Sequence, residues 1–398
     1  MPVLDDLFDP ADLAAAIDAG HVTRKQHPKL PISILTYTPA VQYERAWTPV
    51  TRRCRGLVVD DGTGEIIGWP FEKFFNLDEA GQPYAPPLPD EPFQIFDKID
   101  GSLSVVFFYD GQWRAASKGS FASEQAVWSK AWLDDHDAGG LRPGVTYLAE
   151  TLYPENRIVV DYGGREDLVL LGAYDRDGAE LPLHEAAVGW RGVGSVVRTW
   201  PAMPLQKLRA AMAVGELPDG HAVSGMEAEG FVLRYASGLR VKCKLAEYVR
   251  LHKILTGVNE RDIWRLLGIK RLAGYPPKQV AKALMCPPSD VTAAAGTSSL
   301  DGLLAQVPDE FYSWVRSVCA RLDGQTAALC RTVETTYAAH AHLTADRRAF
   351  AEAVQSTVPD PAVRSAVFLR LDGRPYELPL WRSIRPEPTA PFRTDEEN

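Results

Sequence analysis

The sequence predicts an α+β fold in which antiparallel sheets flanked by helices come first and an all-helical region follows. Apolar, β-branched runs separated by Gly/Asp turns recur through the first 245 residues or so. After that point the apolar residues take helical spacing, with short breaks, to about residue 370. No Pro- or Ser-rich linker separates the two regions, so we expect two domains that follow each other directly.

The first elements are a helix and a strand. Residues 9–20 have Asp9 at the N-cap position, Pro10 at the first helical position and Gly20 just past the end. Residues 31–38, PISILTYT, are apolar and β-branched enough to form a strand.

Hairpins dominate the rest of the first region. The strongest is 102–118, because Asp110-Gly111 is the residue pair that a type I′ turn favours. Two further hairpins are predicted at 55–71 and 231–245, a helix at 123–136, and strands at 145–153 and 167–175. We therefore divide the chain into a sheet domain at 1–253, a helical domain at 254–385 and a flexible tail at 386–398.

Composition excludes several classes of protein. The chain is 45% hydrophobic and 24% charged, which supports packed cores rather than disorder. No apolar run approaches the roughly 20 residues that span a bilayer. The acidic N-terminus is unlike a signal peptide, and the cysteines form no CxxC pair, so a cytoplasmic location is expected. The net charge of −9 argues against general coating of nucleic acid, although a local basic cleft is compatible with it.

Lysine is used sparingly. Only 13 of the 43 basic residues are lysines, so arginine supplies the ordinary positive charge. Five of these lysines nevertheless stand inside short patterned segments: Lys73, Lys98, Lys118, Lys242 and Lys244. Chance clustering is one interpretation. The other is that these positions need an amine, because arginine stays protonated and cannot act as a nucleophile.

The segment FDKIDGSL places Lys98 and Asp100 two residues apart, so on a strand both would enter one pocket. Alone, this pattern is as compatible with a turn that carries a solvated lysine. Other charged residues recur at predicted strand ends and on strand faces, namely Arg55, Lys73, Lys118, Glu150, Glu229, Lys242 and Lys244. Lys242 and Lys244 are expected on one face of their strand, and Val241, Cys243 and Leu245 on its apolar face.

Such a set suits a nucleoside triphosphate. Phosphates need neutralisation by lysine, arginine and a divalent metal, and carboxylates position that metal or bind ribose hydroxyls. A lysine crowded by other cations becomes a nucleophile at neutral pH. Neither the GxxxxGK[ST] pattern nor GxGxxG is present, which disfavours P-loop and Rossmann sites. The residues therefore predict covalent nucleotidyl transfer through a lysine.

These motifs resemble those of the covalent nucleotidyltransferases, the ligases and capping enzymes. KIDGS, the strand of Glu150, EGFV and VKCK are similar to motifs I, III, IV and V of that superfamily. FEKFFNL, SKGS and YPENRIVVDY resemble the bacteriophage-type RNA ligase 1 family in particular. The resemblance covers about 35–253, implies an N-terminal nucleotidyltransferase domain, and is faint beyond 255.

The resemblance implies a role for each residue. Lys98 would take AMP from ATP, and Asp100 matches the acid of the KxDG motif. Glu150 matches a ribose-contacting glutamate, and Glu229 matches the glutamate that organises Mg²⁺ or Mn²⁺ and its waters. The resemblance also implies that Glu150 contacts this ion through water. The positions that match phosphate or nucleotide contacts are Tyr37, Arg55, Lys73, Lys118, Lys242 and Lys244.

The implied reaction is ATP-dependent joining of an RNA 3′-hydroxyl to a 5′-phosphate. Lys98 accepts AMP and pyrophosphate leaves, AMP moves to the RNA 5′-phosphate, and the 3′-hydroxyl displaces AMP. Helices follow motif V where DNA ligases and capping enzymes have a β-rich OB-fold, which disfavours both. A nick-sealing RNA ligase of the second phage type and an inert RNA-end-binding protein remain as alternatives. No membrane or protein partner is implied, and we expect the helical domain to select the RNA.

Overall fold

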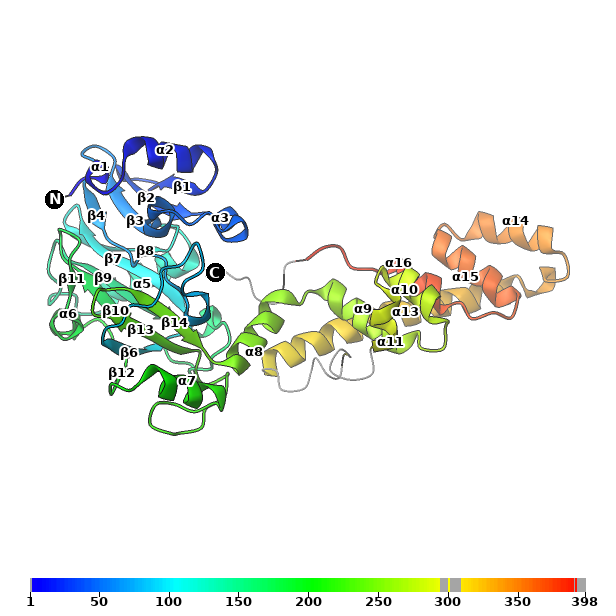
Figure 1. Cartoon of the computed structure of the whole chain (residues 1–398). Coiled ribbons are helices and arrows are strands. Elements are labelled where there is room, and N and C mark those ends of the chain that lie inside the picture. The colour runs from blue at the N-terminus through cyan, green and yellow to red at the C-terminus, as the bar shows by residue number, and fades with distance from the viewer. Residues whose placement is uncertain (1, 294–299, 301–308, 390, 392–398) are drawn as a thin grey trace. The chain divides into compact units, whose positions relative to one another are not determined.

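The computed structural model describes residues 2–293, 300, 309–389 and 391 (Figure 1). The chain divides into two compact units after Leu251, and each is described by itself. The α+β fold class is confirmed: the first unit is built on antiparallel sheets, and the described elements of the second are helices. Of the predicted tail at 386–398, only 386–389 and 391 are described, and the rest lies outside the described residues.

Three sheets form the first unit (Figure 1). The first has the order β1-β2-β3-β4, with strands Val22–Gln26, Ile32–Tyr37, Arg55–Asp60 and Ile66–Gly68. The second has the order β11-β10-β9-β7-β8, with strands Glu180–Leu181, Asp167–Tyr174, Thr146–Leu152, Ser102–Tyr109 and Gln112–Ser117. The third has the order β12-β6-β13-β14-β5, with strands Thr199–Trp200, Phe93–Lys98, Gly230–Tyr235, Arg240–Lys244 and Phe75–Asn76.

Helices of this unit lie mostly on the outer sheet faces or in connections. They are α1 to α7, at Leu4–Leu7, Pro10–Asp18, Pro39–Glu44, Pro49–Arg53, Glu124–Asp135, Leu183–Trp190 and Leu205–Ala213. The predicted cap of α2 is confirmed, because the Asp9 carboxylate accepts a hydrogen bond from the Ala11 amide at 2.8 Å. The predicted turn of the 102–118 hairpin is also confirmed, since Asp110 and Gly111 both have positive φ.

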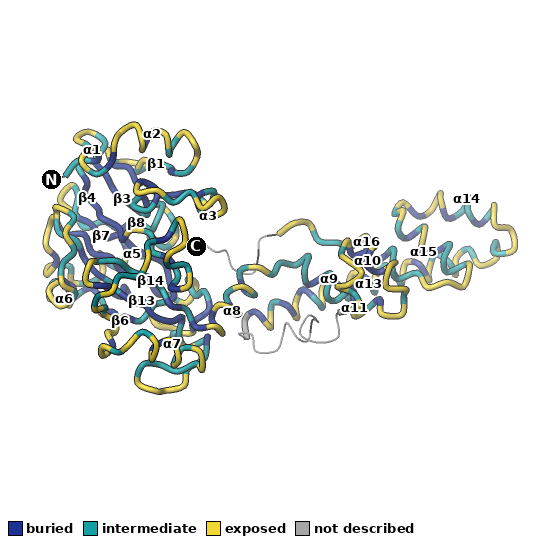
Figure 2. Tube along the Cα trace, viewed as in Figure 1, coloured by how far each residue is buried: buried dark blue, intermediate teal, exposed yellow. Residues whose placement is uncertain are grey.

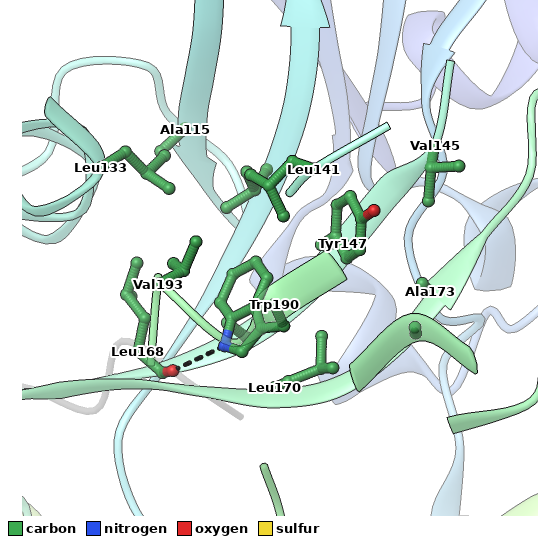
Figure 3. Packing of buried hydrophobic residues seen from close by; sticks show 13 residues of the cluster. Ala115, Leu133, Leu141, Val145, Tyr147, Leu168, Leu170, Ala173, Trp190 and Val193 are labelled. Carbon is green, nitrogen blue, oxygen red and sulfur yellow. Dashed lines mark hydrogen bonds between the residues drawn. The ribbon is translucent and has the colours of Figure 1, made fainter. Parts of the chain in front are cut away.

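The second sheet is the middle layer, and its two faces have different partners. Leu103 and Leu148 on one face pack with Ile34 of the first sheet, and Leu152 on the same face packs with Phe96 of the third sheet. The opposite face packs against α5 and α6 around the fully buried Trp190 (Figure 3). Buried residues accordingly follow the strands, and exposed residues follow the outer helices and loops (Figure 2).

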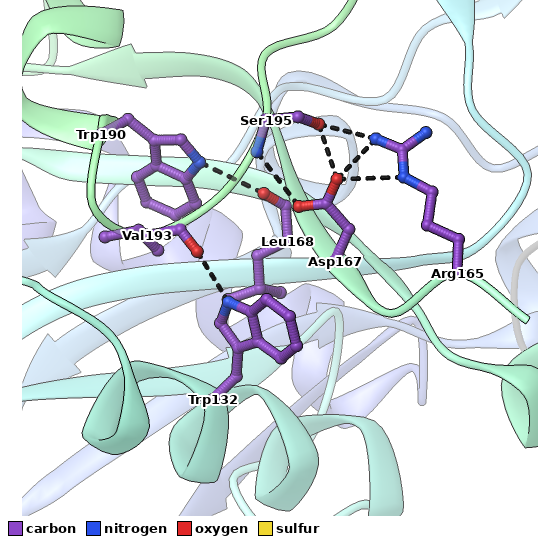
Figure 4. A network of polar contacts seen from close by, with 7 residues as sticks. All are labelled: Trp132, Arg165, Asp167, Leu168, Trp190, Val193 and Ser195. Atoms are coloured by element: carbon purple, nitrogen blue, oxygen red, sulfur yellow. Dashed lines mark hydrogen bonds and ion pairs between the residues drawn. The ribbon is translucent and has the colours of Figure 1, made fainter.

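A polar network fixes the connection from the second sheet to the third (Figure 4). The Asp167 carboxylate accepts hydrogen bonds from the Ser195 amide at 3.1 Å and hydroxyl at 2.7 Å, and it pairs with Arg165. The chain then enters β12, which pairs with β6, and the Trp200 indole donates to Asp97 at 2.6 Å. The strand that ends in Lys98 is therefore held along its outer edge.

The second unit has its own core, built where α13, α14, α15 and α16 meet around Phe350 and Val367. Trp264 of α9 is fully buried and stacks on Trp381, so it is a core residue of this unit. The helix α8, at Ala246–Gly257, begins in the first unit. The remaining described helices are α9 (Glu260–Arg271), α10 (Pro277–Leu284), α11 (Pro288–Ala293), α13 (Asp309–Ala339), α14 (Arg347–Thr357), α15 (Pro361–Leu371) and α16 (Glu377–Ser383). None of the helices described has the length and apolarity that crossing a bilayer requires.

Candidate active site

Strand register brings the predicted lysines together. Gly230 of β13 pairs with Lys98 of β6 on one side and with Lys244 of β14 on the other. Directly paired residues project from the same face of a sheet, and so do residues two apart on one strand. Lys98, Lys242 and Lys244 therefore share the face that carries Phe96, which packs toward the second sheet. Cys243 lies on the opposite, apolar face with Val241, as predicted.

Glu229 links two of these lysines. Lys98 Nζ lies 2.8 Å from Glu229 Oε2, and Lys244 Nζ lies 2.9 Å from Oε1. The carboxylate is 2% exposed, while the two lysine side chains are 18% and 16% exposed. Burial alone would raise the pKa of Glu229, but the two ammonium groups hold that pKa below its usual value. Glu229 is therefore a buried anion between two cations.

A glycine makes this arrangement possible. Gly230 has a φ of 144°, and a Cβ atom built there would lie 2.0 Å from the Cys243 carbonyl oxygen. No side chain fits at that distance, so only glycine lets β13 and β14 approach closely enough for Glu229 to reach both lysines. Gly101 has a similar constraint, because its Cβ would lie 2.6 Å from the Thr151 carbonyl oxygen, next to Glu150.

Lys73 and Lys242 have a different environment. The side-chain amine of neither residue makes an ion pair or hydrogen bond with any described residue. Burial, together with Arg55 and Lys118, lowers the pKa of Lys73 to about 7. Burial, then Lys73, Lys244 and Lys98, lower the pKa of Lys242 well below its usual value. In the cluster formed by Lys73, Lys98, Lys242 and Lys244, two of the four amines, those of Lys73 and Lys242, therefore lack a partner of negative charge among the described residues.

Aromatic rings surround Lys73. Its Nζ lies 5.0 Å from the centre of the Trp47 ring and 5.7 Å from that of the buried Tyr37. Lys118 follows directly after β8, as predicted, and its Nζ lies 5.3 Å from the Tyr37 ring centre. Arg55 begins β3, and its Nη1 is buried without a hydrogen-bond partner among the described residues. The cationic groups at this end of the site could therefore bind an anion.

Asp100 differs from the prediction. Strand β6 ends at Lys98, so the expectation that the two residues share a strand face is wrong. The Asp100 carboxylate, 2% exposed, accepts hydrogen bonds from the amides of Val159 and Val160 and from the Tyr248 hydroxyl, at 2.6–2.9 Å. Burial and then Glu229 raise the pKa of Asp100 to about 6. This geometry favours a positioning role, which holds the 159–162 loop and α8 next to Lys98.

Glu150 lies in β9, as predicted, and is 6% exposed. It shares its strand face with Leu148 and Leu152, the face that packs toward the first and third sheets. Glu150 and the lysines of the third sheet therefore lie on sheet faces that are turned toward each other.

Sequence patterns missed three aromatic residues of the site. Tyr162 accepts a hydrogen bond from the Asp100 amide at 2.8 Å, Tyr248 donates to the Asp100 carboxylate, and Trp47 packs against Tyr37 with ring centres 4.9 Å apart. Only Tyr162 lay within a quoted motif, YPENRIVVDY. Tyr248 could have been found from its place four residues after Lys244, at the start of the next helix.

A metal at this site would need ligands besides protein. No group of three or more His, Cys, Asp and Glu side chains in the described part of the chain could hold one. Mg²⁺ commonly binds through one or two carboxylates, with water and substrate phosphates completing its shell. Glu229 and Glu150 fit such an ion if it arrives with a polyphosphate.

Comparison with known proteins gives a consistent set of relatives. The sequence model of a family described as RNA ligase matches residues 53–248. RNA ligase 1 of bacteriophage TS2126 is 29% identical over 210 residues, 45% of this chain and 49% of that protein. An RNA ligase of Rhodothermus phage RM378 is 24% identical over 165 residues, 31% of this chain and 37% of that protein.

The chain spans about half the length of the curated relatives it matches. Among solved structures, an archaeal ATP-dependent RNA ligase aligns over 64% of each chain at 14% identity, with a TM-score of 0.41.

Proposed function

We propose that this chain, which belongs over residues 53–248 to the RNA ligase family, is an ATP-dependent RNA ligase that works through a lysyl-AMP intermediate. The observation that carries the proposal is the lysine cluster: four lysines, one buried glutamate between two of them, and two amines with lowered pKa values. A triphosphate would supply the missing negative charge.

The first step follows from this geometry. Lys98 Nζ attacks the α-phosphorus of ATP, a P–N bond forms, the bond to the β-phosphate oxygen breaks, and pyrophosphate leaves. The ammonium gives its proton to Glu229, which accepts its hydrogen bond at 2.8 Å and orients the amine for attack. Lys73, Lys242 and Arg55 bind the phosphates, and the Nη1 of Arg55 gains the partner that it lacks.

Mg²⁺ or Mn²⁺ entering with ATP would neutralise phosphate charge. Glu229 and Glu150 are the carboxylates suited to hold it, directly or through water. In the second and third steps AMP passes to an RNA 5′-phosphate, and an RNA 3′-hydroxyl then displaces AMP. Lys242 and Lys244 act in all three steps, because the AMP phosphate is the reacting or leaving group in each.

We assign RNA selection to the helical region at 254–385. The residues proposed for chemistry lie before residue 254, and a helical unit of this size joined to them would orient the RNA. A protein truncated after residue 257 should then still form the adduct but lose its preference among RNA ends.

The test is direct. The full-length protein is incubated with labelled ATP and Mg²⁺ or Mn²⁺, and the labelled adduct is detected on a denaturing gel. It is then given a single-stranded 5′-phosphorylated RNA or a nicked duplex. We expect an adduct and circular or joined single strands. Joining of the nicked duplex alone would favour the nick-sealing alternative, and no adduct at all would favour an inert binder.

A further inference from the structure

A groove of about 580 Å³ lies beside the proposed phosphate site. One wall comes from β1, the end of β2 and α3, and contributes Lys25, Tyr37, Gln42 and Tyr43. The other comes from the start of β7, the segment after β8 and the start of α5. Tyr37 and Lys118 belong to this groove and also contact or approach Lys73, so the groove is continuous with the site.

The charge of the groove is unusual for an acidic protein. The chain has 52 Asp and Glu residues, yet the described residues that line this groove include no carboxylate and two lysines, Lys25 and Lys118. Another large pocket of this unit, about 570 Å³, contains Glu72 and Glu180, and Glu180 already pairs with Arg234 and Arg240. The groove lined by Lys25 and Lys118 is therefore better suited to a polyanion than the pocket that contains Glu72 and Glu180.

The second wall offers groups that bind phosphates and sugars. Ser117, Ser120 and Ser123 line it, and Ser123 caps the 12-residue helix α5. The positive end of that helix dipole therefore adds to the field of the two lysines. Gln125 of the first helical turn also lines this wall, and its side chain lies 3.4 Å from Asn156.

An aromatic ring stands on the first wall. Tyr43 is 87% exposed, although it lines the groove. A single exposed tyrosine needs no explanation, but the helix that carries this one is firmly held. Thr38 donates to the Gly20 carbonyl at 2.7 Å, His21 contacts Glu44 at 2.9 Å, and Val41 is fully buried. The ring is thus presented to solvent on a fixed support.

We propose that this groove binds single-stranded RNA next to the end to be joined, with Tyr43 stacking on a base and Lys25 contacting the backbone. Lysines that track a backbone, combined with an exposed ring, are how proteins bind unpaired strands. Bases in a duplex are stacked already and leave no free face for such a ring. The proposal rests on the ligase function above and adds the surface of this chain that holds the unpaired strand.

The test uses the full-length protein and a fluorescein-labelled, 5′-phosphorylated RNA 12-mer, with binding followed by anisotropy. Tyr43→Ala should weaken binding about 10-fold, whereas Tyr43→Phe, which keeps the ring, should stay within about 2-fold. Lys25→Gln should lower the slope of log affinity against log salt by about 0.7, which is one phosphate contact. Lys29→Gln removes the same charge from an exposed lysine outside the groove and should leave that slope unchanged.

The Lys98–AMP adduct is measured in the same four variants, and we expect wild-type yields. Unchanged RNA affinity in Tyr43→Ala would overturn the proposal, as would an equal loss for a nicked duplex. A lost adduct in Tyr43→Ala would assign the groove to ATP instead and would also overturn it. Absence of the adduct from the wild-type protein would contradict the ligase function, while the RNA affinities would still decide the groove.

Discussion

The two halves of the lysine cluster contain the same side chain in opposite electrostatic settings. Lys98 and Lys244 share the carboxylate of Glu229, at 2.8 and 2.9 Å. Lys73 and Lys242 have no such partner in the described chain, and burial with neighbouring cations lowers the pKa of both. The charges of the paired half are therefore balanced without ligand, whereas those of the other half become balanced only when an anion binds.

The largest effect should come from the paired half. Lys98→Arg keeps a cation for Glu229 but removes the amine that can lose its proton, so we expect adduct formation to fall at least about 1,000-fold. The melting temperature should stay within a few degrees. Labelled ATP and a denaturing gel measure the adduct, and Lys130→Arg, in an exposed helical ion pair, is the control. Full adduct yield in Lys98→Arg would identify another nucleophile.

Glu229→Gln makes the paired half resemble the unpaired one. The amide keeps the shape without the charge, so Lys98 and Lys244 lose their shared anion. We expect ligation to fall about 100- to 1,000-fold, with a clear loss of stability. Rates from preadenylated RNA separate the later steps from the attack on ATP. The exposed Glu227→Gln should behave as wild type, and a near-normal rate for Glu229→Gln would contradict the pairing model.

Lys73→Met tests the unpaired half through pH. The pKa of Lys73 is about 7 in the folded chain and 10.5 in model compounds, so between these values the unfolded chain binds more protons. The free energy of unfolding of the wild type should therefore rise with pH across this window. Lys73→Met should be more stable by up to about 5 kcal/mol below pH 7, and this gain should vanish near pH 10.5.

Urea unfolding at pH 6.5 and pH 9 measures the difference, with the exposed Lys207→Met as the control. The variant should also lose adduct yield about 10-fold at limiting ATP, because a phosphate contact is gone. A gain in stability that does not change with pH would show that folding does not lower the pKa of Lys73.

The smallest effect on adduct formation should come from replacing Asp100. In Asp100→Asn the amide oxygen can still accept from Val159 and Val160, and the Tyr248 hydroxyl can turn to accept from the amide nitrogen. We expect less than a 10-fold loss of adduct, whereas Asp100→Ala should cost about 2–4 kcal/mol of stability.

The pH dependence adds a check on Asp100. Its pKa is raised to about 6, so the wild type should lose stability as pH rises from about 4 to 6, because the folded chain keeps the proton longer. Asp100→Asn should lack this slope. A well-folded Asp100→Asn protein without adduct would place Asp100 in the chemistry.

Local sequence patterns predicted much of the fold and of this site. The turn at Asp110-Gly111, the cap at Asp9, and the alternation of Lys242, Cys243 and Lys244 depend on neighbours in the chain, and each is confirmed. Tyr248, Trp47 and the groove depend on segments that meet only in the folded unit. The pairing of Glu229 with Lys98 joins residues 131 positions apart, so spacing could suggest it but could not establish its geometry.

Gly230 has a practical consequence for genetics. Because a methyl group at position 230 would strike the Cys243 carbonyl, Gly230→Ala would act as a wedge between two strands. It would separate Lys98, Glu229 and Lys244 without deleting a single ionisable group. Such an allele would encode a chain that keeps every charged residue of the site but holds them in the wrong geometry. It is therefore the inactive control for complementation experiments with variants that change a charge.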